Sequence, residues 1–306
     1  MIVNLPETTT GAVAKTLDRL RDEGGAVALG RVLTLIVDVG SREVETAVET
    51  ANDASREHPC RVIVLVSDPA RTGGRLDAEI RVGGDAGASE VVVLTASAEL
   101  LAHADTLVMP LLLPDAPIVA WWPYEVPTEP STHPVGAMAQ RRITDTLECS
   151  HPLESLRRLR ASYQEGDTDL AWTRLTVWRG LLSAALDQPP FENVTSAEVE
   201  GNDTHPSVVL LGAWLAHALR CPVTLNRSAE DTAVTRVVLH RASGPIVLDR
   251  PDGRTATIEQ PGQPARHAAM PLRQLRECLS EELRRLDADE VWGEVLHDGL
   301  ARIGEA

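Results

Sequence analysis

The sequence predicts an α/β protein, in which an open, mostly parallel twisted sheet with flanking helices forms the N-terminal part and a smaller α+β part follows. Continuous apolar runs, typical of strands covered on both faces, alternate with stripes of helical spacing over the first half. The second half opens with helices and continues with short strands. A length of 306 residues also exceeds what one core usually spans. We therefore expect an N-terminal domain at 1–165 and a C-terminal domain at 166–306.

Each element of the N-terminal part follows from its residue pattern. The apolar spacing from Val13 to Leu20 predicts a first helix, and Ser41 can cap a second helix that buries Val44 and Val48. Residues 76–82 alternate between apolar and charged, which indicates an antiparallel strand near the sheet edge. The other expected elements are strands at 32–39, 62–66, 91–94, 118–122 and 142–146, helices near Leu100 and over 153–159, and a proline-interrupted, extended loop at 123–134.

The C-terminal part begins after a hinge at 165–167. A stripe from Ala171 to Ala185 predicts a helix that Pro189 stops, and an apolar run over 210–219 predicts another. Strands are expected near Val223 and at 234–239, 246–248 and 255–258, followed by a short last helix at 291–296. Before that last helix, a longer one is expected to turn five leucines inward, namely Leu272, Leu275, Leu279, Leu283 and Leu286.

The charge and the cysteines exclude several classes of partner. The formal net charge is -16, which repels phosphate backbones and anionic lipid surfaces, so we expect neither a nucleic acid nor a membrane partner. The longest apolar stretch, 107–122, is interrupted by prolines and cannot span a bilayer, and the first residues do not read as a secretion signal. Four widely spaced cysteines without a CxxC pair suit a reducing compartment, so a cytoplasmic location is expected.

Motifs that carry catalysis or bind cofactors are missing from the sequence. The glycine-rich stretch 83–89 has neither the GxGxxG spacing nor a GK[ST] ending, and it joins two expected strands, so turn formation is the preferred interpretation. HExxH, GxSxG and CxxC do not occur. We therefore predict no catalytic residue, no cofactor and no metal ion.

Tryptophan is the unusual feature, because it supplies six of the nine aromatic residues. Trp121 and Trp122 end an expected strand and run into Pro123 and Tyr124, at the strand end where ligands and partners meet an open parallel sheet. Together with the following pair Arg141 and Arg142, they have the composition of an interface hot spot, although core packing is the alternative.

In the C-terminal part, one tryptophan and two arginines also allow two interpretations. Trp172, Arg174 and Arg179 lie beside the apolar stripe of their helix. They fit either a partner contact or long side chains that lie along the surface.

Five segments resemble the glucose-6-phosphate dehydrogenase assembly protein family, OpcA, in its actinobacterial form. They are HPCRVI (58–63), DAPIVAWWP (115–123), AQRRITD (139–145), DTDLAWTRL (167–175) and EELRRLDADEV (281–291), and they are spread over most of the chain. Tyr124 stands where the family pattern has glycine, and Trp292 where tyrosine is more usual.

The resemblance implies a protein without catalytic activity that binds glucose-6-phosphate dehydrogenase, the NADP-dependent entry enzyme of the oxidative pentose phosphate pathway. Such a protein favours the active oligomer or the substrate-competent state of that enzyme, which requires only tighter binding to one state. Whether the chain associates with itself stays open.

Two other functions are carried as alternatives. The Trp and Arg pairs could grip a phosphorylated sugar, which would make the chain a sugar-phosphate-binding protein with a weak activity of its own. Cys60 lies in a family-like segment, so it is a possible redox residue, with a buried inert thiol as the other interpretation.

Overall fold

The computed structural model describes residues 1–23, 32–82, 90–228 and 233–304, and the chain forms two compact units. Unit 1 comprises Met1–Asp145, Gly166–Thr168 and Leu275–Ala288, and unit 2 comprises Thr146–Glu165, Asp169–Gln274 and Asp289–Ala306. The predicted α/β fold class is confirmed, whereas a single domain boundary after residue 165 stays a prediction. The glycine-rich stretch 83–89 lies outside the described residues.

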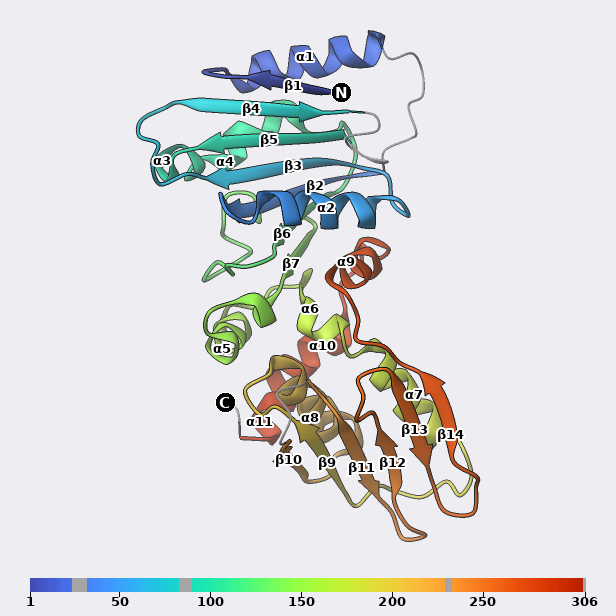
Figure 1. Ribbon diagram of the computed structural model, residues 1–306. Helices are drawn as coiled ribbons and strands as arrows, with labels where there is room; N and C mark the ends of the chain where they lie inside the picture. Colours follow the sequence, from blue (N-terminus) through green and yellow to red (C-terminus); the bar gives the residue numbers. More distant parts are fainter. Residues whose placement is uncertain (24–31, 83–89, 229–232, 305–306) are drawn as a thin grey trace. The chain divides into compact units, whose positions relative to one another are not determined.

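Unit 1 is built on an eight-stranded sheet with the order β1-β4-β5-β3-β2-β6-β7-β8 (Figure 1). Its strands are β1 (Ile2–Leu5), β2 (Leu33–Gly40), β3 (Cys60–Ser67), β4 (Leu76–Arg81), β5 (Glu90–Ala96), β6 (Ile118–Trp122), β7 (Arg141–Thr144) and β8 (Asp167–Asp169). The pairs from β5 through β3, β2 and β6 to β7 are all parallel. Strand β4 pairs antiparallel with β5 on one side and with the edge strand β1 on the other, as its alternating pattern predicts.

Helices cover both faces of this sheet, which explains why its central strands are apolar throughout. The helices of unit 1 are α1 (Thr10–Glu23), α2 (Val44–Ser55), α3 (Ala98–Leu101), α4 (Ala104–Val108), η2 (Met109–Leu111) and α9 (Leu275–Leu283). One core cluster joins α1, α4 and η2 to the sheet. Helix α2 packs on β2 and β3, and α9 lies beside α2 although more than 200 residues separate them in the chain (Figure 1).

Unit 2 holds a six-stranded sheet with the order β10-β9-β11-β12-β13-β14, antiparallel except where β9 meets β10. Its strands are β9 (Ser196–Gly201), β10 (Val223–Arg227), β11 (Arg236–His240), β12 (Ile246–Asp249), β13 (Thr255–Glu259) and β14 (Arg266–Ala269). Its helices are η3 (Thr146–Glu148), α5 (Pro152–Ser162), α6 (Leu170–Thr173), α7 (Thr176–Leu186), α8 (Pro206–Leu219), α10 (Glu290–Glu294), η4 (Val295–Gly299) and α11 (Leu300–Arg302). Leucine and valine side chains of α7 and α8 form one core with the inner face of the sheet.

Three details differ from the sequence predictions. Strands β1, β8, β9 and β14 were not expected. Helix α9 is shorter than expected, and Leu272 and Leu286 are 54% and 39% exposed, so the inward placement of these two leucines is wrong. Residues 125–127 have no regular structure, bends flank them, and turns begin at residue 130, so turns replace the expected extended loop only over its last part. None of the helices in the described segments is both long and apolar enough for a membrane span.

Candidate functional site

A crevice opens in unit 1 at the carboxyl ends of β2, β3 and β6. The chain continues from β2 through α2 to β3 on one side of β2, and β6 pairs on the other side. Such a reversal of strand order leaves a gap at the strand ends, where open α/β sheets bind their ligands. The crevice has a volume of about 760 Å³ and is lined by residues from 38–43, 67–70, 122, 124–127 and 133. We regard it as the candidate functional site.

The carboxylate of Glu43 lies where a dinucleotide-binding fold would hold a phosphate. In such folds the first strand leads through a glycine-rich turn into a helix whose amino end binds the phosphate. Here β2 leads into α2 through residues 41–43, and Glu43 occupies the N-cap position of the helix. The Oε2 atom of Glu43 lies 2.8 Å from where a Cβ on Gly40 would be, so its carboxylate folds back over the turn. A negative charge at this place disfavours nucleotide and sugar phosphates.

Asp38 and His133 form a close pair inside the crevice. The Nε2 atom of His133 lies 3.6 Å from a carboxylate oxygen of Asp38, and the two side chains are 25% and 27% exposed. Burial raises the pKa of Asp38 to about 6, an effect that the indole of Trp122 opposes and the charge of Glu125 reinforces. Burial also lowers the pKa of His133. Asp38 therefore holds a charge near neutral pH that its imidazole neighbour does not neutralise.

Trp122 lies beside Asp38 and packs against His133. It is 2% exposed, packs in the core cluster of the sheet, and meets the His133 ring edge to face at 5.3 Å between ring centroids. Its indole N–H is buried and makes no hydrogen bond within the described part of the chain. The segment that carries His133 is fixed by close packing, because a Cβ on Gly136 would lie 1.8 Å from the carbonyl oxygen of Pro130. The site is thus preformed by packing, and Trp122 contributes an unused donor to it.

The structure places the predicted tryptophans of unit 1 inside the fold. Trp121 is 0% exposed, and it points to the sheet face opposite to that of Trp122, since successive strand residues alternate. Pro123 is also buried, whereas Tyr124 is half-buried and lines the crevice. In this conformation a partner reaches Tyr124 but not the two indole rings. An interface role for this segment stays a prediction.

The predicted arginine pair makes internal contacts. Arg141 is 1% exposed, donates to Glu282 at 2.6 Å and to the carbonyl oxygen of Asp287 at 2.8 Å, and so ties α9 and the segment after it to β7. Arg142 donates to the carboxylate of Asp167 and to a backbone carbonyl. Both side chains therefore hold unit 1 together, and a direct partner contact by them would require the fold to open.

The three predicted residues of the C-terminal part belong to unit 2. Trp172 is 1% exposed, and its indole N–H donates to Asp289 at 2.8 Å. The guanidinium of Arg179 stacks 3.7 Å above the Trp172 ring centre, and both Arg179 and Arg174 are half-buried. This stacking is a packing contact within unit 2. A partner contact by the two arginines stays a prediction.

Cys60 begins β3 and is 0% exposed. None of the four cysteines forms a disulfide, and Cys278 is buried as well. A thiol without exposed surface offers an oxidant no access in this conformation, which leaves the redox role of Cys60 as a prediction. No cluster of three or more His, Cys, Asp or Glu suited to a metal ion occurs in the segments that the structure covers.

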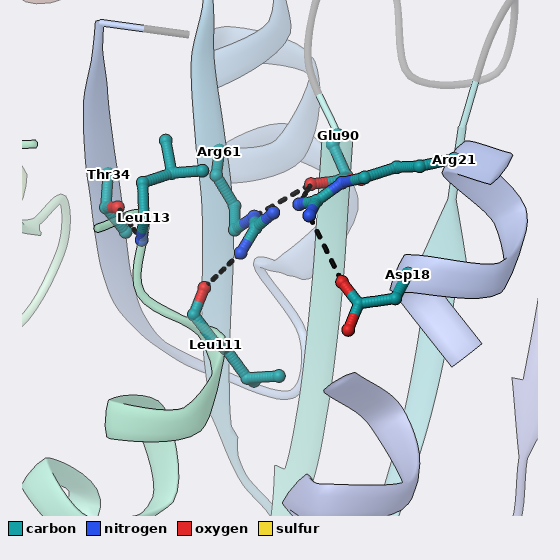
Figure 2. Close-up of polar contacts among 7 residues, drawn as sticks. All are labelled: Asp18, Arg21, Thr34, Arg61, Glu90, Leu111 and Leu113. Atoms are coloured by element: carbon teal, nitrogen blue, oxygen red, sulfur yellow. Dashed lines mark hydrogen bonds and ion pairs between the residues drawn. The ribbon is translucent and has the colours of Figure 1, made fainter. Parts of the chain in front are cut away.

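A buried ion pair lies near the amino ends of β3 and β5 (Figure 2). Glu90, at the start of β5, is 1% exposed and accepts hydrogen bonds from Arg61 at 2.7 Å and from Arg21 at 2.9 Å. Arg61 also donates to the backbone carbonyl of Leu111. These contacts connect α1, η2 and the sheet, so the arginine of the HPCRVI segment has a structural role.

Asp38, Glu43, Glu125 and His133 are site residues that the sequence analysis missed. One of them could have been recognised in the sequence: Asp38 is a carboxylate in an otherwise apolar strand, close to the carboxyl end of that strand. The partners of Asp38 come from a turn and from a loop more than 80 residues away, and no local pattern connects them.

Comparison with solved structures returns similar oxidoreductases at low sequence identity. A 3-ketoreductase (KijD10) from Actinomadura kijaniata in complex with NADP is 9% identical, with a TM-score of 0.48 over 86% of this chain and 93% of that chain. A glucose-6-phosphate 1-dehydrogenase from Mycobacterium avium is 13% identical, with a TM-score of 0.46 over 86% of this chain and 90% of that chain. A search of curated proteins finds no match.

Two family models match consecutive stretches of the chain. One describes the N-terminal domain of a glucose-6-phosphate dehydrogenase subunit, and it matches residues 51–161. The other describes the C-terminal domain of that same subunit, and it matches residues 165–296. Together they span most of the chain in the expected order, and the resemblance found in its sequence segments is confirmed. The chain belongs to the OpcA family of glucose-6-phosphate dehydrogenase assembly proteins.

Proposed function

We propose that this protein is a non-catalytic activator and assembly factor that binds glucose-6-phosphate dehydrogenase in the cytoplasm. The observation that carries the proposal is the match of both halves of the chain to the two domains described for a subunit of that enzyme. The carboxylates at the start of α2 add to it, because they disfavour a nucleotide at the place where a dehydrogenase of similar topology would bind one.

Activation of this kind needs a difference in binding and no chemistry. If the protein binds the active oligomer or the substrate-competent state of the enzyme tenfold more tightly, it shifts the equilibrium by about 1.4 kcal/mol. The activated enzyme then shows a changed saturation curve for glucose-6-phosphate, and the activator alone turns nothing over.

Size-exclusion chromatography of the protein mixed with the dehydrogenase of its own organism tests the proposal. We expect co-migration together with a shifted glucose-6-phosphate saturation curve. Separate elution of the two proteins with an unchanged curve would remove the proposal. An unrelated acidic protein, such as serum albumin, serves as the control for non-specific effects of charge.

One observation favours a second candidate. Asp38 and His133 lie 3.6 Å apart in a crevice, and such a pair can act as general acid and base. The chain would then be a sugar-phosphate-binding protein with a weak activity of its own, although the carboxylates that line the crevice oppose the phosphate group of such a substrate. Turnover of pentose-pathway sugar phosphates by the purified protein, lost in Asp38→Asn, supports this second function. Thermal-shift measurements with the same sugar phosphates separate the two, since an adaptor alone needs no stabilisation by a small ligand.

A further inference from the structure

We infer that the crevice at the carboxyl ends of β2, β3 and β6 receives a basic peptide segment of the protein's partner, with an arginine or lysine side chain against Asp38. The inference rests on the proposed function, since it states the chemistry by which that partner is recognised. Four observations support it: the charge of the lining, an unused donor beside an uncompensated carboxylate, the volume, and the apolar wall.

The lining carries more negative than positive charge. Its carboxylates are Asp38, Glu43, Asp68 and Glu125, and its only arginine is Arg42, which is exposed. Asp68 is compensated by Arg71 at 3.1 Å, just outside the lining. For the other three carboxylates the structure gives no arginine or lysine ion pair in the described residues. A cationic group is therefore the complementary ligand, and an anionic one is repelled.

The unused donor is the second observation. The Trp122 side chain is 98% buried, and its N–H, which lies beside Asp38, has no hydrogen-bond partner among the described residues. A carboxylate has two oxygens, and it can accept from the indole and from a guanidinium or ammonium group at once. A bound cation would hold Asp38 in its ionised form, which is the form that draws the indole N–H into a hydrogen bond.

The volume and the wall select a peptide over a small ion. About 760 Å³ exceeds the space that a single cation fills, and the described residues hold no metal-binding cluster. Val126, Pro127 and Pro69 supply apolar surface on which the alkyl stem of a lysine or arginine can lie. A second copy of this chain is a poor occupant, since each copy carries a net charge of -16 and the two copies repel one another.

The decisive experiment compares the affinities of variants for the dehydrogenase by isothermal titration calorimetry. The test variant is Asp38→Asn with Glu125→Gln, which removes two crevice carboxylates while keeping side-chain size. The matched control is Asp203→Asn with Glu259→Gln, which removes two exposed carboxylates from unit 2. We expect the test variant to bind at least tenfold more weakly and to lose part of the salt dependence, and the control to stay within twofold of wild type.

The outcomes separate this inference from the proposed function. If wild-type protein does not bind the enzyme, the proposed function fails. If wild type binds and the test variant binds equally well, only the crevice inference fails. If the double variant melts at a lower temperature than wild type, the single variant Glu125→Gln replaces it in the affinity measurement. Glu125 is exposed, so its replacement does not disturb the core.

A second arm identifies the ligand chemistry directly. Tetra-arginine should compete with the enzyme for wild-type protein, whereas tetra-glutamate should not. If L-arginine amide competes at the same concentration as tetra-arginine, the site takes a free small cation, and the peptide claim is overturned.

Tetra-arginine should also bind more weakly at pH 5.5 than at pH 7.5. Protonation of Asp38 and of His133 both lower the negative charge of the crevice, and the carboxylates that face them from the other elements are Glu43, Asp68 and Glu125. Equal binding at the two pH values would contradict contact with Asp38.

Discussion

Replacing Asp38 by asparagine should make the protein more stable at neutral pH, although the substitution removes a charge from the candidate site. Burial raises the pKa of Asp38 from 3.8 to about 6, so the folded state binds a proton that the unfolded state has already lost between these two values. The contribution of the Asp38 carboxyl to stability is at its maximum below pH 4, falls as the pH rises towards 6, and stays low above pH 6.

The size of the effect follows from the same numbers. Each pKa unit is worth about 1.4 kcal/mol, so a rise from 3.8 to about 6 sets an upper limit of about 3 kcal/mol. The Asp38 side chain is 27% exposed, and solvent reduces the value, so we expect Asp38→Asn to stabilise the protein by about 1–3 kcal/mol at pH 7.5. Asparagine keeps an oxygen that can accept from Trp122, which limits other losses.

Urea unfolding followed by circular dichroism at pH 7.5 and pH 4 measures this difference. The variant should unfold at a higher urea concentration than wild type at pH 7.5, and the gain should shrink at pH 4. Asp77→Asn is the control of opposite sign, because a backbone hydrogen bond from Glu7 and the side chain of Arg71 lower the pKa of Asp77, and the loss of its charge should destabilise unit 1. An Asp38→Asn variant that is no more stable than wild type at pH 7.5 would refute the reasoning.

Two further predictions concern the buried charges of unit 1. Arg141→Ala should destabilise the protein by about 3–5 kcal/mol, since it breaks the buried ion pair with Glu282 and removes the donor to the carbonyl oxygen of Asp287; an unchanged urea midpoint would contradict an internal role for Arg141. Glu90→Ala should cost a similar amount by leaving the buried guanidinium of Arg61 uncompensated. Arg61→Met combined with Glu90→Leu should recover most of that loss, apart from about 1–3 kcal/mol for the unpaired carbonyl of Leu111, and a double variant as unstable as Glu90→Ala would refute this account.

The parts of the fold that the sequence predicts are those with strong local patterns. The apolar runs of β2, β3, β5 and β6 indicate strands covered on both faces, and the structure has helices on both faces. The missed strands are edge strands or carry short and charged side chains. Strand β9, for example, buries only small or β-branched side chains, Ala197 and Val199, between glutamates.

The candidate site depends on contacts that no local pattern shows. Arg141 and Arg142 look like surface recognition residues in the sequence, because arginine is usually exposed. Their partners Glu282 and Asp167 lie 141 and 25 residues further along the chain, and only the tertiary fold brings them together. For the same reason, the sequence shows that Trp122 ends a strand, but it does not show that Trp122 lies beside Asp38 and His133.

The return of residues 275–288 to unit 1 has a consequence for synthesis on the ribosome. Domains usually fold as they emerge, the amino-terminal one first. Here α2 lacks its neighbour α9, and Arg141 lacks Glu282, until almost all of the 306 residues have been translated. Unit 1 is thus begun first but completed only when residue 288 has been made, after most of unit 2. Until then a nascent chain carries an unpaired side of α2 and an uncompensated arginine that a chaperone would have reason to cover.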